Sequence, residues 1–143
     1  MSAHSAISVG QGVKLAQHAT YQQRAIAVLQ HVSEILGTRD AIREFRVRRI
    51  QSDHLGFHHV RVEQRHAGVR VVGAELIVHF DNHDRAYEVN GRYIPGISLT
   101  PTPQISAEDA ADSATTDLRR RALPEGELRE EPELVVYARH SPN

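Results

Sequence analysis

The side chains best suited to chemistry in this chain are its ten histidines, four of which cluster at His54, His58, His59 and His66. Histidine binds metal ions and titrates near physiological pH. On a β-strand, neighbouring residues point to opposite faces, so His58 and His59 cannot bind one ion together. We therefore expect surface histidines and no metal site. A related hypothesis stays open, in which histidines titrating between about pH 5 and 8 weaken binding to a partner on acidification.

Patterns that support catalysis are weak in this sequence. The chain has no cysteine, its serines do not form a G-x-S-x-G nucleophile elbow, and it contains no H-E-x-x-H zinc-peptidase motif. Glu63, Glu75 and Glu88 could be neighbours across strands, yet carboxylates in such positions usually face solvent. We expect a binding protein without enzymatic activity and without a cofactor.

Composition fits a soluble globular protein of one domain, or one domain and part of another. The net charge of −1 gives no overall attraction to nucleic acid. Arg43, Arg46, Arg48 and Arg49 form a basic cluster, but alternation places Arg46 and Arg48 on one face and Arg49 on the other, so no continuous stripe is expected. We also expect no membrane segment, because no apolar run approaches about 20 residues, and no signal peptide.

Period-two alternation predicts an antiparallel sheet. Val60 and Val62 precede a turn at His66 to Gly68, and a second run follows in which Val72, Ala74, Leu76, Val78 and Phe80 share a face. A third run, 85–93, follows a turn at 81–84, and residues 44–50 offer a fourth strand in which Ile50 is out of phase and indicates a bulge or the strand's end.

Helical patterns flank this sheet. A stripe over 13–36, ended by Gly37, predicts a long helix that packs on one sheet face and gives an α+β fold. The prolines within 95–104 predict a linker. After it, Ser106 should cap a helix over 107–122, and a short strand is expected at 134–138. The predicted division is a helix-plus-sheet domain at 1–94, a linker at 95–104 and an incomplete helix-strand unit at 105–143.

Three stretches of this sequence resemble the fungalysin/thermolysin propeptide domain, which begins the pro-region of thermolysin-type zinc metallopeptidases. They are L-G-F-H-H-V-R-V-E-Q at 55–64, G-V-R-V-V-G-A-E-L-I-V-H at 68–79 and V-N-G at 89–91. The segment 105–137 resembles the opening of a PepSY-type domain. The first resemblance implies a cystatin-like arrangement of one long helix on a four-stranded antiparallel sheet.

The resemblance implies a secreted propeptide that inhibits a thermolysin-type catalytic domain and assists its folding. The motif positions that would bind this partner or maintain the domain's structure are Arg61, Gln64, Gly68, Arg70, Gly73, Glu75, Asn90 and Gly91. For Arg61 and Gln64 we favour hydrogen bonds that anchor the sheet, and for Gly68 and Gly73 conformational requirements. Arg70 departs from the family, which commonly has proline there.

A competing hypothesis is a stand-alone module that binds a protein or a small ligand and has no peptidase in the same chain. The two hypotheses differ in what they expect of the sheet. A sheet face fully covered by the first helix leaves no pocket and favours protein binding, whereas an exposed apolar cavity favours a ligand.

Overall fold

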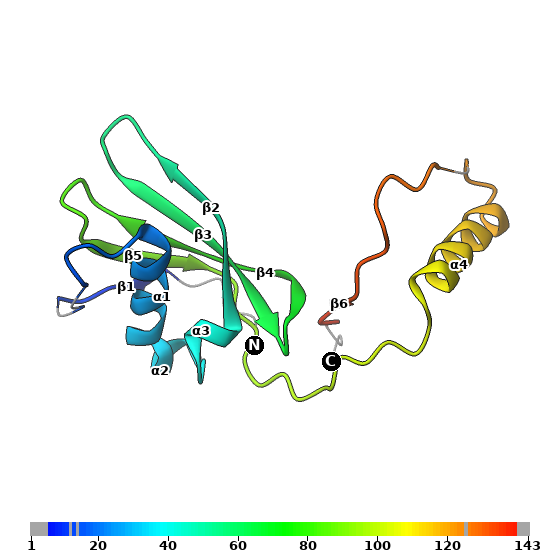
Figure 1. The fold of residues 1–143 in the computed structure, drawn as a ribbon, viewed down its shortest axis with the longest axis horizontal. Coiled ribbons are helices and arrows are strands. Elements are labelled where there is room, and N and C mark those ends of the chain that lie inside the picture. The colour runs from blue at the N-terminus through cyan, green and yellow to red at the C-terminus, as the bar shows by residue number, and fades with distance from the viewer. Residues whose placement is uncertain (1–5, 12, 14, 125, 140–143) are drawn as a thin grey trace.

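The fold is known from a computed structural model, which describes residues 6–11, 13, 15–124 and 126–139. Helices α1 (Tyr21–His31), α2 (Ser33–Leu36) and α3 (Ala41–Glu44) pack on one side of a twisted sheet, and α4 (Ala107–Arg120) lies apart from them (Figure 1). The sheet contains six strands in the described part of the chain. The α+β class is confirmed, whereas the single long helix and the four-stranded sheet are wrong.

The predicted helix over 13–36 is shorter because Thr20 starts it. The Thr20 hydroxyl accepts from the backbone N–H of Gln23, and the Gln23 side chain accepts from the backbone N–H of Thr20, so a complete capping box fixes the N-terminus. At the other end, Val32 leaves helical geometry and separates α1 from α2. Gly37 ends α2 in the left-handed conformation, as predicted.

Four strands form the antiparallel centre of the sheet, in the order β5–β4–β3–β2: β2 (Phe45–Ser52), β3 (His58–His66), β4 (Val69–Phe80) and β5 (Ala86–Gly91). Two short strands at its margins were not predicted as part of this sheet. Strand β1 (Ile7–Ser8) pairs antiparallel with β5, and β6 (Val135–Val136) pairs parallel with β4. A two-residue strand carries almost no alternation, so sequence periodicity cannot detect where it pairs.

The core lies between α1 and the sheet. Val28 and Leu29 of the helix and Val60, Val78 and Phe80 of the sheet have no solvent exposure. Because side chains alternate along each strand, burial of this face sends the intervening residues to the opposite face. We call that opposite face, which bears the side chains of His59, Arg61, Glu63, Glu75, Ile77 and His79, the open face.

Bulges interrupt the pairing and change which residues share a face. Between Glu63 and Arg65 the register of β3 with β4 shifts, and Gly73 of β4 has a φ of +74°. As a result Val71 is buried, with 1% of its surface exposed, while Val72 is only half-buried. The prediction that Val72 shares a face with Ala74 is therefore wrong. The bulge suggested by Ile50 is confirmed, and it falls between Val47 and Arg49.

The C-terminal arm, residues 95–139, contacts the sheet chiefly through β6 (Figure 1). Val136 packs with Val71 and Ala74 in a second, smaller cluster. Helix α4 is capped by Ser106 as predicted but contains no buried residue. None of the helices in the described residues has the length and apolar composition needed to cross a bilayer. The division into a domain, a linker and an incomplete unit stays a prediction.

Replacing the α1 cap should destabilise the folded protein. Thr20→Ala removes the side-chain acceptor for one N-terminal N–H of a helix that packs on the core, so we expect a loss of about 1 kcal/mol in the free energy of unfolding. Urea unfolding measures it. Ser106→Ala is the matched control, because it removes the equivalent cap from α4, which buries nothing. Equal losses from the two variants would contradict the separate packing of α1 and α4.

Candidate partner-binding site

The open face carries four of the eight predicted site residues, Arg61, Arg70, Glu75 and Asn90, and charged side chains dominate it. Glu63 lies at its centre with 2% of its side chain exposed, between two arginines. Arg48 Nη1 donates to Glu63 Oε2 at 2.9 Å, and Arg65 Nη2 donates to Oε1. A buried carboxylate needs such partners, because an unpaired charge out of water is very costly. The pairing therefore fixes both guanidinium groups on the open face.

Arg61 and Glu75, both predicted site residues, form an ion pair on this face. Arg61 Nη1 donates to Glu75 Oε2 at 2.9 Å, and 44% of each side chain remains exposed. Pairs this exposed contribute about 0–1 kcal/mol to stability. Their contribution to folding is therefore small, and both groups stay accessible to a partner.

Arg70 binds the C-terminal arm. Its Nη2 donates to Glu133 Oε2 at 2.9 Å and its Nε donates to Oε1 at 3.2 Å, a two-pronged contact suited to guanidinium geometry. The pKa of Glu133 is lowered mainly by this hydrogen bond, and further by the charges of Arg65 and Arg48. A carboxylate from a distant segment thus lies within the field of the open-face arginines.

Strict alternation along β2 predicts fewer arginines on this face than the structure places there. Arg46 pairs with Glu63 and Arg49 pairs with Arg61 in the ladder, and directly opposed residues share a face. The bulge at Val47/Arg49 adds one residue, so Arg48 also reaches Glu63. The prediction that Arg49 lies opposite Arg46 and Arg48 is wrong for this reason. The out-of-phase Ile50 was the available signal for it.

Gln64 belongs to the buried face and joins the sheet to the start of the C-terminal arm. Its Nε2 donates to the carbonyl of Ile94 at 2.7 Å, and its Oε1 accepts from the N–H of Ile94 at 2.9 Å. These two bonds satisfy the buried amide. Gln64 therefore holds the chain where it leaves the sheet, and 3% exposure leaves it little surface for a partner.

The three predicted glycines allow backbone conformations that other residues rarely adopt. Gly68 has a φ of +80° in the β3–β4 turn, and Gly73 lies at the bulge. Gly91 has a φ of +126°, and a Cβ added there would lie 2.2 Å from the carbonyl oxygen of Glu75. That oxygen accepts from the N–H of Arg92 at 2.8 Å. Only glycine permits this close approach of β5 to β4.

A row of hydrogen-bonded side chains crosses the open face at the other end of the strands. His59 Nε2 lies 3.0 Å from Asp53 Oδ2, and His59 Nδ1 lies 2.6 Å from His79 Nδ1. His79 Nε2 lies 3.2 Å from Asn90 Oδ1, and Asn90 Nδ2 donates to Glu88 Oε1 at 3.3 Å. This row connects four segments of the sheet and includes Asn90, a predicted site residue.

The Asp53 carboxylate can only accept, so His59 Nε2 donates to it, and the Asn90 oxygen accepts from His79 Nε2. Which of the two Nδ1 atoms donates to the other depends on the ring tautomers. As predicted, His58 points to the other face, where its Nδ1 lies 3.0 Å from the Tyr21 hydroxyl.

The histidine pair is too close to share a metal ion. Two nitrogens bound to zinc at about 2.0–2.1 Å in tetrahedral geometry lie more than 3 Å apart, beyond the 2.6 Å that separates these two. Over the residues that the structure describes, no group of three or more His, Asp or Glu side chains is arranged to hold a metal ion.

The strands that form the open face match a known protein family. Residues 43–93 match the family described as the Fungalysin/Thermolysin Propeptide Motif. The match begins in α3, covers β2 to β5 and so includes the whole open face, and it indicates a propeptide of fungalysin- or thermolysin-type peptidases. No curated protein matches the chain. The match stops before the C-terminal arm, so the PepSY resemblance stays a prediction.

Replacing Gly91 should be far more damaging than replacing Gly68. Gly91→Ala puts a Cβ into the Glu75 carbonyl and forces β5 away from β4, so we expect a loss of about 3 kcal/mol or more in the free energy of unfolding. Gly68→Ala meets no atom within 4 Å and should cost only about 1–2 kcal/mol for its positive φ. Chemical unfolding of both variants measures the difference, and equal losses would contradict the close approach.

Asp53 should make stability fall in acid. Its pKa is lowered below 3.8 chiefly by the hydrogen bond from His59. A carboxyl with a lowered folded-state pKa stabilises the fold above its unfolded value, and this contribution is lost as pH falls through the folded value. Urea unfolding at a series of pH values below about 5 should therefore show a shallower decline for Asp53→Asn. An unchanged slope would contradict the His59–Asp53 bond, since Asn keeps the oxygen that accepts from Leu55 and Phe57.

Proposed function

We propose that this chain is a propeptide segment that inhibits a thermolysin-type zinc metallopeptidase and assists the folding of its catalytic domain. The observation that carries the proposal is the propeptide-motif match over residues 43–93, which coincides with the central strands. The partner is the peptidase catalytic domain. As part of such a pro-region the segment is secreted with its enzyme, and residues 105–143 belong to an incomplete PepSY-like unit that follows.

The surface of the sheet supports binding to a protein. Its buried face is filled by α1, with Val60, Val62, Val78 and Phe80 fully covered. A hollow of about 820 Å³ lies where the chain leaves the sheet, and its wall mixes apolar side chains such as Ile94 and Ile97 with charged ones such as Arg39 and Arg65. Among the described residues, the filled buried face leaves no apolar cavity between α1 and the sheet, and this favours a protein partner over a small ligand.

Binding would use the open face and leave the core unchanged. The predicted site residues Arg61, Glu75 and Arg70 expose charged groups there, while Gln64, Gly73 and Gly91 maintain the backbone behind them. Interfaces of standard size bury about 1,600 Å² in total, and a four-stranded face with its adjoining arm can provide half of that. Inhibition then comes from occupying surface beside or over the peptidase cleft.

The proposal is tested with a catalytic domain of this class, for which mature thermolysin is an accessible probe. We expect the chain to slow peptide hydrolysis in a saturable manner and to raise the yield of active enzyme on refolding. A zinc peptidase outside this class is the control. Full activity at saturating chain together with an unchanged refolding yield would contradict the proposal for this probe.

The reading frame around the segment provides a second, independent test. A frame that continues into an H-E-x-x-H motif supports a propeptide that acts on its own chain, and it supplies the cognate catalytic domain for the same assays. A frame without that motif would contradict the intramolecular role. In that case the stand-alone binding module becomes the better explanation of the fold.

A further inference from the structure

The open face concentrates positive charge that the composition conceals. Three strands place arginines on it. The described carboxylates of this face are Glu63, Glu75 and Glu88, together with Asp53 and Glu133 from neighbouring segments. The six arginines are Arg46, Arg48, Arg49, Arg61, Arg65 and Arg70. The whole chain carries a formal net charge of −1, so the rest of the molecule is acidic. A local field of this kind attracts a partner of opposite charge.

Four of these arginines already hold a carboxylate. Arg48 and Arg65 share Glu63, Arg61 binds Glu75, and Arg70 binds Glu133. Arg46 and Arg49 are the remaining two. Both are exposed, and neither side chain has a hydrogen bond or ion pair to any residue that the structure describes. They stand on the edge strand β2.

The four arginine ion pairs on this face have the same chemistry, a guanidinium group with a carboxylate. The Arg70–Glu133 pair shows that the carboxylate can come from a segment 63 residues away in sequence. Nucleic acid would also be attracted by charge, but single strands need aromatic rings for stacking between basic groups. Arg61 is paired on β4 with Ile77, which has no aromatic ring. The rings of Phe57 and Tyr87 lie at the end of the sheet that carries His59 and His79. The chemistry favours an acidic protein surface.

We propose that Arg46 and Arg49 dock a carboxylate-rich surface of the peptidase catalytic domain onto the open face. This inference rests on the proposed function and names the surface that performs it. Arg61 and Arg65 adjoin this pair, so an incoming carboxylate meets several guanidinium groups at once. Charged groups arranged in this way mainly raise the association rate and fix the orientation of the complex.

Arg46 and Arg49 also have a purely structural explanation. Charged side chains on an edge strand keep it from pairing with the strands of other molecules. Edge protection requires charge of either sign. A variant that reverses the sign therefore keeps the protection and loses only the attraction to carboxylates. This difference separates the two explanations.

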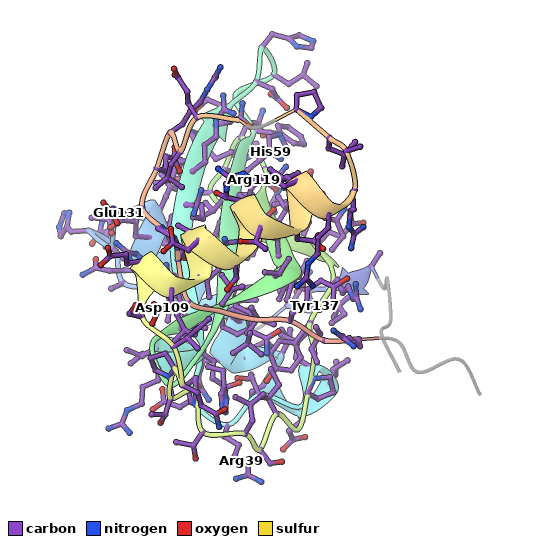
Figure 2. All side chains as sticks on the ribbon, turned by 90° about the vertical axis from the view of Figure 1, so that its right-hand side faces the viewer. Arg39, His59, Asp109, Arg119, Glu131 and Tyr137 are labelled. Carbon is purple, nitrogen blue, oxygen red and sulfur yellow. The ribbon has the colours of Figure 1, made fainter. Side chains whose placement is uncertain are left out.

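The test compares Arg46→Glu/Arg49→Glu with a control that changes the net charge equally. The control is Arg39→Glu/Arg120→Glu: Arg39 lies between α2 and α3, at the opposite end of the molecule from His59 (Figure 2), and Arg120 lies on α4. Affinity for the cognate catalytic domain, or for thermolysin, is measured at several salt concentrations, and unfolding confirms that both variants fold. We expect the open-face variant to bind about tenfold more weakly or worse, with a flatter salt dependence, and the control to bind like the parent chain.

Each outcome decides a different point. Equal affinity of the parent chain and the open-face variant overturns the docking surface and leaves the proposed function intact. Equal weakening by both variants also overturns it, because a general charge effect then explains the loss. If the parent chain binds no catalytic domain, the proposed function fails and this inference fails with it. Tighter binding of a single-stranded DNA oligomer through the same two arginines would replace the acidic protein partner.

Discussion

The close approach of β5 to β4 at Gly91 is the constraint on which the arrangement of this sheet depends. No side chain fits between Gly91 and the Glu75 carbonyl, so the two strands are held together at the point where β5 ends. Arg92 then donates to that carbonyl, and Gln64 binds the backbone of Ile94 two residues further on. These three contacts fix where the chain leaves the sheet. They also define where the open face ends and where the C-terminal arm begins.

Much of the central sheet could be predicted from sequence because burial of one face imposes alternation. Val60, Val62, Leu76, Val78 and Phe80 show it, and the turn at Gly68 follows from its glycine. The helix boundary was mispredicted because apolar spacing extends back to Val13, whereas the helix begins at the Thr20 capping box, a local hydrogen-bond pattern that periodicity ignores. Strand β1 and the pairing of β6 with β4 were missed because two residues cannot display a period.

The candidate site was harder to predict than the fold, since it depends on bulges. A single extra residue in β2 moves Arg49 to the same face as Arg46, and alternation alone puts it on the other. Likewise the hydrogen-bonded row from Asp53 to Glu88 includes residues as many as 37 positions apart, Asp53 and Asn90. Their arrangement in one row follows only from the strand register. The net charge of −1 also failed to indicate this surface. It is a sum over the whole chain, so the positive charge of the open face and the negative charge of the other residues cancel in it.

The pairing of β6 with β4 is short, with two residues in register, one ion pair from Arg70 and a small apolar cluster around Val136. Such a contact would be weak between separate molecules. Here the proline-containing segment 95–104 tethers the two partners, so the strand binds at a high effective concentration. A single peptide-bond cleavage in that segment would convert this contact into a bimolecular one. The arm would then dissociate while the helix-plus-sheet unit kept its own core, so the tether makes the arm releasable by proteolysis.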